Sequence, residues 1–451
     1  MRSLPRALFA PTHFLVAALL LTLTATLTAT LATALPAYAE NRATPGNFTG
    51  YGFDQCDTPT QEMMDVWLEY SPFLAAGIYI SGDSRACKEQ KNLTADWVTN
   101  QLAAGWRLLP ITLGPQASCS GRFPRYGSDP VIIDDPGDDG LYEQARDQGQ
   151  AEASKAVMAA DALGIVAGST LWYDIEAFDH TRLKCRDSAL AFLSAWTTRL
   201  HALGYVSGVY SSAGSGILIL EQARIAQTPK IALPDYIWVA RWDEVANTST
   251  SYISEEGWNP HRRVKQYMGG HLETWGGVTI NIDRNFLDVG KGSRARKETH
   301  CGGKPIDFPR YRPLREGVKR PDMVVALKCL LKERGYYKGK ITLGFGPKAI
   351  RGVKTWQEKH GFKVQPKWTK RNWVGLLSQG KQPVLKFGSA GKFVRRIQRS
   401  VNGTQVAELA ITGVYDASTR KAVRAWQKQA GLTVTGVVAD NSWDALQSGR
   451  F

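Results

Sequence analysis

Short apolar runs alternate with helical patterns along the first half of the chain. Continuous or period-two apolar runs predict strands, and apolar residues at helical spacing predict helices between them. The predicted strands are Gly50–Phe53, Gly77–Ile80, Arg107–Leu113, Leu171–Ile175, Ser207–Tyr210, Tyr236–Ala240, Arg263–Tyr267 and Thr279–Ile282. The predicted helices are Thr60–Tyr70, Ala95–Ala104, Leu141–Leu163 and Asp187–Leu203.

This alternation indicates an α/β fold over residues 48–290. Eight strands within about 240 residues is the number found in a (β/α)8 barrel of the TIM type. A doubly wound open sheet is the alternative, but no G-x-G-x-x-G or P-loop motif follows any of the strands.

Four carboxylates fall near the ends of predicted strands. Asp174 and Glu176 leave the fourth strand on the same face, because side chains alternate with period two. Asp54 follows the first strand and Asp283 ends the eighth, and these two strands are neighbours in a closed barrel. Repulsion within such a group raises the pKa of at least one member, as general acid catalysis requires. The alternative is a set of solvated strand-end caps.

The second half of the chain differs in pattern. Residues 291–320 have the Pro-rich composition of a linker. Residues 321–380 and 381–451 then form an internal repeat with an offset of 70 residues, and Trp356-Gln matches Trp426-Gln. Each copy predicts a small all-α domain of three short helices. We interpret Trp356 and Trp426 as core residues of a helix face.

Ordered motifs in the first half resemble a known family. They are G-x-D at 52–54, D-x-E at 174–176, Val-Tyr-Ser-Ser at 209–212, Ile-Trp-Val-Ala-Arg at 237–241, Lys-Gln-Tyr at 265–267 and I-D-x-N at 282–285. Together they resemble the barrel of family 25 glycoside hydrolases, which are lysozymes that cut peptidoglycan. They resemble still more closely the exported bacterial glycoside hydrolase-like domain related to those enzymes.

The resemblance implies roles for particular residues. Glu176 would be the general acid and Asp174 its partner, with Asp54 and Asp283 as positioning or electrostatic residues. The residues that would line a sugar site are Tyr210, Trp238, Arg241 and Gln266. Trp242 is expected in the core or at the rim, and stacking on a sugar is the alternative. In this sequence Cys56 stands where the lysozymes usually have a small hydroxyl residue.

The two repeats resemble the bacterial peptidoglycan-binding domain. The shared pattern includes Gly-x-Tyr-Asp at 413–416, A-V-x-x-W-Q at 422–427 and W-x-x-L at 443–446. The second repeat keeps Gly436, whereas the first has Pro366 at that position. The resemblance implies a peptidoglycan or anionic wall polysaccharide as partner.

The N-terminal segment predicts that the protein is exported from the cytoplasm. Arg2 and Arg6 precede an apolar segment that ends in Ala37-Tyr38-Ala39, so residues 1–39 are expected to be a signal peptide. No later run is long enough to predict a membrane span.

Charge is divided unevenly along the chain. Residues 40–290 carry 20 Lys+Arg and 31 Asp+Glu, for a net charge of −11. Residues 291–451 carry 34 Lys+Arg and 10 Asp+Glu, for a net charge of +24. An exported chain with one basic half is expected to meet a polyanionic wall polymer.

The six cysteines are expected to form disulfides. They are Cys56, Cys87, Cys119, Cys185, Cys301 and Cys329. None has a zinc-type spacing, so no metal or other cofactor is expected. Six cysteines allow 15 pairings. Adjacent strand ends of a barrel favour pairing of the first with the second and of the third with the fourth. The last two would tie the linker to the first repeat.

These features support a secreted, monomeric, wall-associated glycoside hydrolase-like protein that cleaves glycosidic bonds by carboxylate acid/base chemistry. A catalytically inactive glycan-binding or architectural protein is the main alternative. A nucleic-acid binder is the third reading. It is disfavoured because the basic half matches a wall-binding pattern in an exported chain.

Overall fold

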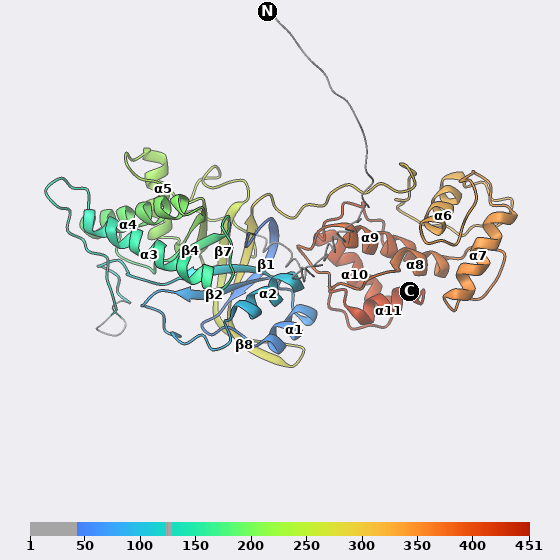
Figure 1. Ribbon diagram of the computed structural model, residues 1–451, viewed down its shortest axis with the longest axis horizontal. Coiled ribbons are helices and arrows are strands. Elements are labelled where there is room, and N and C mark those ends of the chain that lie inside the picture. The colour runs from blue at the N-terminus through green and yellow to red at the C-terminus, as the bar shows by residue number, and fades with distance from the viewer. Residues whose placement is uncertain (1–42, 123, 125–128) are drawn as a thin grey trace, which may run out of the picture. The chain divides into compact units, whose positions relative to one another are not determined.

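Eight strands close into a barrel in the order β1 to β8 (Figure 1). The computed structural model describes residues 43–122, 124 and 129–451, so the expected signal peptide lies outside the described residues. The strands are β1 (Phe48–Asp54), β2 (Ala75–Ser81), β3 (Arg107–Thr112), β4 (Thr170–Asp174), β5 (Val206–Ser212), β6 (Tyr236–Ala240), β7 (Arg262–Trp275) and β8 (Val278–Val289). The covering helices are α1 (Gln61–Tyr70), α2 (Ala95–Ala104), α3 (Glu143–Ala162), α4 (Leu183–Ala202) and α5 (Gly216–Ala226).

The closed barrel confirms the predicted TIM-like fold, but the strand–helix alternation stops after α5. Strand β8 runs antiparallel to both β7 and β1. The β7–β8 connection is the two-residue turn Gly276-Gly277, where φ is +57° and +83°. Both residues need the left-handed region that glycine adopts without a Cβ clash, as in a type I′ hairpin turn. The long β6–β7 connection, residues 241–261, is described throughout and contains no helix.

Large apolar side chains fill the barrel interior. Trp172 and Trp238 are buried there with their rings edge to face, 5.5 Å between centroids. Gly208 makes this packing feasible, because a Cβ at that position would lie 2.4 Å from the Trp172 ring. A second apolar layer lies between the sheet and its helices and includes Phe53 and Trp196. The interior is therefore packed, and any ligand site must lie at the barrel mouth.

Three disulfides confirm the predicted pairing. They join Cys56 to Cys87, Cys119 to Cys185 and Cys301 to Cys329, with Cα–Cα distances of 5.7, 6.0 and 5.8 Å. The first joins the loops that follow β1 and β2. The second joins the segment after β3 to the first turn of α4, because Cys185 lies in that helix and not in the loop where the sequence predicted it. The third joins residue 301 of the expected linker to the first helix of the first repeat, as predicted.

Each repeat contains the three helices expected from the sequence. The first has α6 (Pro321–Glu333), α7 (Pro347–Lys359) and α8 (Lys370–Ser378). The second has α9 (Lys392–Thr404), α10 (Ala417–Gln429) and α11 (Asp440–Gln447). Trp356 and Trp426 are fully buried within separate apolar clusters, which confirms their interpretation as core residues. The two cores also draw on residues outside the three helices of each repeat: Tyr311 and Leu314 of the expected linker are buried in the first, and Val374 of α8 packs in the second.

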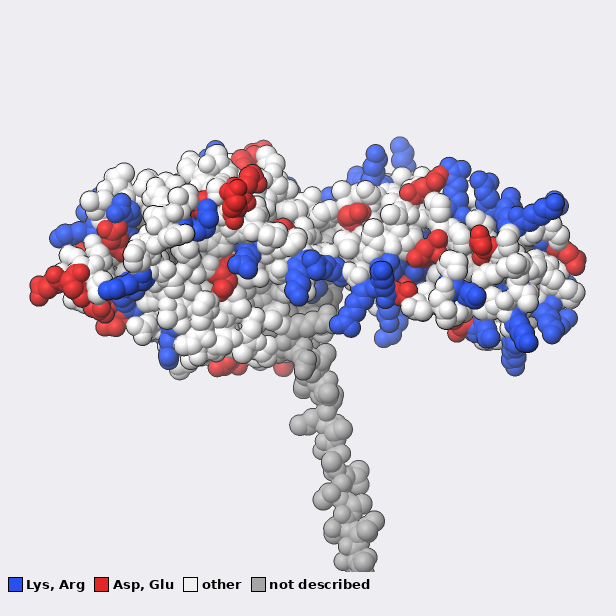
Figure 2. Space-filling model, turned by 90° about the horizontal axis from the view of Figure 1, so that it is seen from above, with Lys and Arg blue, Asp and Glu red and all other residues white. Residues whose placement is uncertain are grey.

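The surface of the repeats is densely covered by Lys and Arg, as Figure 2 shows. The charge division expected from the sequence is thus expressed on the folded surface. Within the described residues, no helix has the length and apolar content that crossing a membrane requires.

Candidate active site

The barrel mouth brings Asp54 and Asp283 together. Asp54 ends β1 and pairs in register with Asp283 of β8. The sequence placed Asp283 at a strand end, but it lies in the middle of the longer, antiparallel β8 and reaches the mouth from within that strand. Gly77 on β2 makes room for Asp54, because a Cβ there would lie 2.6 Å from the Cβ of Asp54.

Two buried amides hold the Asp54 carboxyl. Asn285 donates from Nδ2 to Oδ1 at 2.5 Å, and Gln266 donates from Nε2 to both oxygens at 3.3 Å. Asn285 is itself oriented by Trp238, whose Nε1 donates to Oδ1 at 2.8 Å. Trp238 was expected to line a sugar site. It is only 1% exposed, because its ring packs in the barrel interior, and so it positions Asn285 instead.

The electrostatics of this pair favour a bound proton near neutral pH. Burial, followed by the neighbouring Asp283 charge, raises the pKa of Asp54 well above its ordinary value. Burial, followed by the charge of Glu176, raises the pKa of Asp283 to about 6. Close acidic groups with raised pKa values are typical of sites that carry out proton transfer.

Asp174 and Glu176 approach the mouth from the end of β4. Asp174 is buried and accepts a hydrogen bond from the Tyr79 hydroxyl at 3.2 Å. Buried Gln116 fixes the backbone between them, since its Nε2 donates to the Asp174 carbonyl and its Oε1 accepts from the Glu176 N–H, both at 2.8 Å. The side chain of Glu176 is 19% exposed, so it is the more accessible member.

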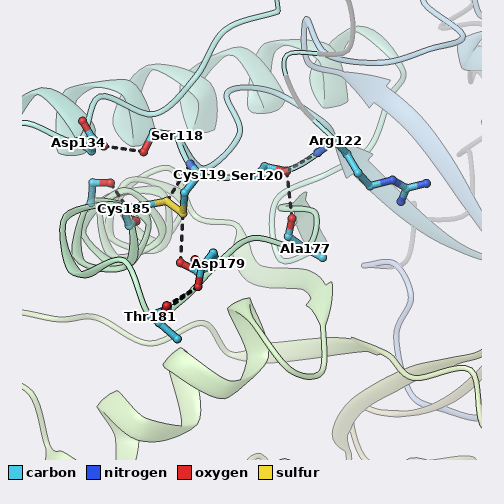
Figure 3. Close-up of a disulfide and its surroundings, with 10 residues drawn as sticks. Ser118, Cys119, Ser120, Arg122, Asp134, Ala177, Asp179, Thr181 and Cys185 are labelled. Carbon is cyan, nitrogen blue, oxygen red and sulfur yellow. Dashed lines mark hydrogen bonds between the residues drawn. A yellow bond between two sulfur atoms is a disulfide. The ribbon is translucent and has the colours of Figure 1, made fainter.

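A segment inserted after β3, residues 114–139, supplies a cation to Glu176. Arg122 Nη1 lies 3.2 Å from Glu176 Oε2. The segment is anchored beside the chain that follows Glu176 by the Cys119–Cys185 disulfide and by the Ser120 hydroxyl, which donates to the Ala177 carbonyl at 3.0 Å (Figure 3). The insertion is therefore built into the mouth.

A pocket of about 180 Å³ lies at the centre of this arrangement. Its lining contains three of the four predicted carboxylates, the first disulfide and an arginine: Asp54, Gln55, Cys56, Tyr79, Arg85, Ala86, Cys87, Leu113, Glu176 and Asp283. Cys56, which replaces the expected hydroxyl, thus forms part of the wall with Cys87. Among the described residues, the one group spaced to hold a metal is Cys301, Cys329 and Glu333, whose two sulfurs form a disulfide.

The other predicted lining residues lie to one side of the carboxylates. Gln266 is buried, and its Oε1 accepts hydrogen bonds from Tyr210 and from Trp242 at 2.9 Å each. Burial, followed by the Asp174 charge, raises the pKa of Tyr210 well above its ordinary value, so the hydroxyl stays protonated as a donor. Arg241 is exposed and lies over the Tyr252 ring at 5.6 Å.

The sequence reasoning gave no role to four residues that organise the site. They are Tyr79, Gln116, Arg122 and Asn285. Asn285 had a usable signal, because it follows Asp283 by two positions and therefore shares its face of β8. Gln116 and Arg122 lie in a Gly- and Pro-rich segment without periodicity, and their contacts arise only when that segment folds back over β4.

Two family models match the chain. Residues 66–287 match the Rv2525c-like, glycoside hydrolase-like domain, and residues 391–446, within the second repeat, match the putative peptidoglycan binding domain. No curated protein matches the sequence significantly.

Solved structures are only distantly similar to this chain. An uncharacterized B. stearothermophilus protein is 19% identical over 53% of this chain and 95% of its own, with a TM-score of 0.34. The Mycobacterium tuberculosis Tat-secreted protein Rv2525c, in complex with L-tartrate, is 13% identical over 53% and 95%, with a TM-score of 0.35. The two family matches and the closed barrel identify the chain as an Rv2525c-like glycoside hydrolase-like domain followed by a peptidoglycan-binding domain.

Proposed function

We propose that this protein is an exported, wall-associated glycoside hydrolase that cleaves peptidoglycan or another wall polysaccharide. The observation that carries the proposal is the pair of unlike carboxyl environments in one pocket. Asp283 has a pKa raised to about 6, whereas Glu176 is more exposed and paired with Arg122. When two carboxyl groups lie in different environments, their pKa values can differ, and one site then supplies both a protonated acid and an ionised partner.

In this mechanism a protonated carboxyl donates to the glycosidic oxygen as the C–O bond breaks. The leaving sugar departs as an alcohol, and an ionised carboxylate stabilises the positive charge that develops on the other sugar. Water then adds to that sugar, and the proton that the water loses restores the acid. The family resemblance assigned the acid to Glu176. We propose instead that Asp283 holds the donated proton, because burial and the neighbouring charge of Glu176 raise its pKa to about 6. Glu176, which forms an ion pair with Arg122, would be the ionised partner. Asp174, which is buried, would stabilise the developing positive charge through its own negative charge.

The remaining parts fit delivery to the wall. The peptidoglycan-binding domain and the net charge of +24 on residues 291–451 support retention on an anionic polymer. Three disulfides suit an oxidising compartment, which supports export.

The test is digestion of purified sacculi with mass analysis of the released fragments. Asp283→Asn and Glu176→Gln keep the side-chain shape and should each lower turnover by about 10²–10⁴-fold, the usual contribution of a positioned acid or base. Activity should fall as pH rises above about 6, where Asp283 loses its proton. Asp138→Asn, in an exposed turn at the end of the insertion, is the matched control and should leave turnover unchanged. If Asp283→Asn retains full turnover, Asp283 is not the donor.

One observation favours a second candidate, a barrel that binds glycan without cleaving it. The pocket of about 180 Å³ is below the roughly 300–1,000 Å³ usual for small-molecule sites, and Glu176 is already occupied by Arg122. Retention of wild-type protein on sacculi with no released fragment at any pH between 4 and 8 would favour this candidate.

A further inference from the structure

Trp242 is unusual among the tryptophans of this protein. It is 62% exposed, whereas the other tryptophans, all of which the structure describes, are buried or half-buried. Tryptophan is a residue that folded proteins bury on average. An exposed indole therefore prompts the question of whether it is held in place for a ligand.

The Trp242 ring is held in place by residues of β7. A Cβ on Gly269 would lie 2.7–2.8 Å from three atoms of the six-membered ring of Trp242, so the indole lies over the bare backbone of this glycine. Its Nε1 donates to Gln266 Oε1 at 2.9 Å. One face of the ring is thus seated on β7 and its polar edge is satisfied.

The loop that carries Trp242 is also tied down. Lys265 is 1% exposed, and its Nζ donates to both carboxylate oxygens of Asp243 at 3.1 and 3.0 Å. The same ammonium donates to Asn247 Oδ1 at 2.7 Å and to the Ser249 carbonyl at 3.1 Å. A buried cation with four oxygen contacts holds the residues on the C-terminal side of the indole, which limits the entropy that binding would cost.

Gln266 connects the Trp242 ring to the carboxylates of the barrel mouth. Gln266 accepts from Trp242 and donates to Asp54, so one side chain links the indole to the acidic pair. The residues that follow Trp242 in the loop, Asp243 and Glu244, are acidic, which disfavours contact with an anionic membrane. The apolar C–H face of a pyranose ring suits a flat, exposed indole at the edge of an acidic mouth.

We propose that Trp242 is the stacking platform of a saccharide subsite next to the Asp54–Asp283 pair. Its occupant is one pyranose ring of a β-1,4-linked N-acetylamino sugar chain. The choice of this sugar class rests on the proposed function, whereas the platform itself rests on the geometry of Trp242, Gly269 and Gln266.

The test uses the full chain labelled with 5-fluorotryptophan and titrated with chitotetraose, the β-1,4-linked tetramer of N-acetylglucosamine. The fluorine signal of Trp242 is the one missing in Trp242→Phe. We expect this signal to shift and saturate, and its titration gives the dissociation constant at this ring even if the repeats also bind sugar. A Trp242 signal that stays in place up to 10 mM chitotetraose overturns the proposal.

Two glycine variants provide the matched comparison. Gly269→Ala keeps Trp242 but displaces its ring, and should weaken the affinity reported by that signal by about 10-fold. In Gly270→Ala the nearest side-chain atoms would be 3.8 Å away, an ordinary contact, and affinity should stay within about twofold. Equal affinity in the Gly269→Ala variant and the wild type also overturns the platform.

The subsite and the hydrolase can fail separately. A saturable shift without any turnover of sacculi keeps the subsite and rejects hydrolysis. Turnover without a shift of the Trp242 signal keeps hydrolysis and rejects the subsite.

Discussion

At the scale of single residues, the Asp54–Asp283 pair lowers the stability of the folded protein when its carboxyl groups are ionised. Both carboxyls have pKa values raised by burial, and Asn285 and Gln266 offset only part of this through hydrogen bonds. A group whose pKa is higher in the folded than in the unfolded state stabilises the fold fully at low pH. That stabilisation is lost as pH rises towards the folded-state value.

Asp283→Asn should therefore stabilise the protein in a pH-dependent way. Little difference from wild type is expected at pH 4, where the carboxyl is largely protonated in the folded protein. At pH 8 the variant should have the larger free energy of unfolding, by up to about 3 kcal/mol for a shift of about two units. Urea titrations at pH 4, 6 and 8 measure this. A difference that does not grow with pH, as expected of the exposed Asp138→Asn control, would contradict it.

At the scale of elements, connecting segments build much of the mouth. The β6–β7 connection carries Trp242 and is organised by Lys265, and the insertion after β3 carries Arg122 and is anchored by Cys119. Loops on a rigid barrel usually carry function, and here buried polar contacts and a disulfide hold two of them in defined positions.

Lys265→Met should loosen the β6–β7 connection. The substitution removes a buried cation and leaves Asp243 without its partner, and breaking a buried pair costs about 3–5 kcal/mol. We expect about 3 kcal/mol, because Asp243 is 30% exposed and regains some hydration. Hydrogen exchange at residues 241–250 should speed up. Lys184→Met, on the exposed side of α4, is the control and should change the unfolding free energy by less than about 0.5 kcal/mol.

Replacing both Cys119 and Cys185 by Ala should destabilise the barrel. The bridge spans 66 residues, and loss of a native disulfide costs about 2–5 kcal/mol. Thermal unfolding of the double variant should show a lower midpoint for the barrel. The Cys301→Ala/Cys329→Ala variant should instead lower the stability of the first repeat, because Cys329 lies in α6. An unchanged barrel midpoint in the first variant would show that the insertion is held by other contacts.

At the scale of the whole molecule, charge separates two tasks. The barrel half has a net charge of −11 and the half with the repeats +24. Attraction between exposed charges and an anionic wall is screened over about 8 Å at physiological ionic strength and over about 3 Å at 1 M salt.

Wall attachment should therefore belong to residues 291–451 and weaken with salt. A fragment of these residues should be retained on purified sacculi at 50 mM NaCl and largely released at 1 M, since exposed charges are then screened. A fragment of residues 43–290 should be retained weakly at both. Circular dichroism of each fragment is the control for folding. Equal retention of the two fragments would contradict this division.

The sequence alone determined much of this architecture. Local hydrophobic periods located all eight strands, and the 70-residue repeat predicted three short helices in each copy, as the structure shows. The order of strands in a closed barrel was enough to pair the cysteines and to place β1 beside β8, although Asp283 reaches Asp54 from the middle of β8 and not from its end as predicted. These features depend on local periodicity and on the order of strands, both of which are written along the chain.

Only the tertiary structure decided the polarity of β8, the burial of Trp238 and the site of the raised pKa values. Gly276-Gly277 was not predicted to be a hairpin turn, and the direction of β8 became clear only from its antiparallel pairing with β1 and β7. Trp238 faces inward because its ring packs against Trp172, 66 positions away along the chain. The pKa of Asp283 depends on burial and on Glu176, and the Glu176 ion pair depends on an insertion from another strand. Burial and charge act over a few ångströms in space, and distance along the chain does not specify them.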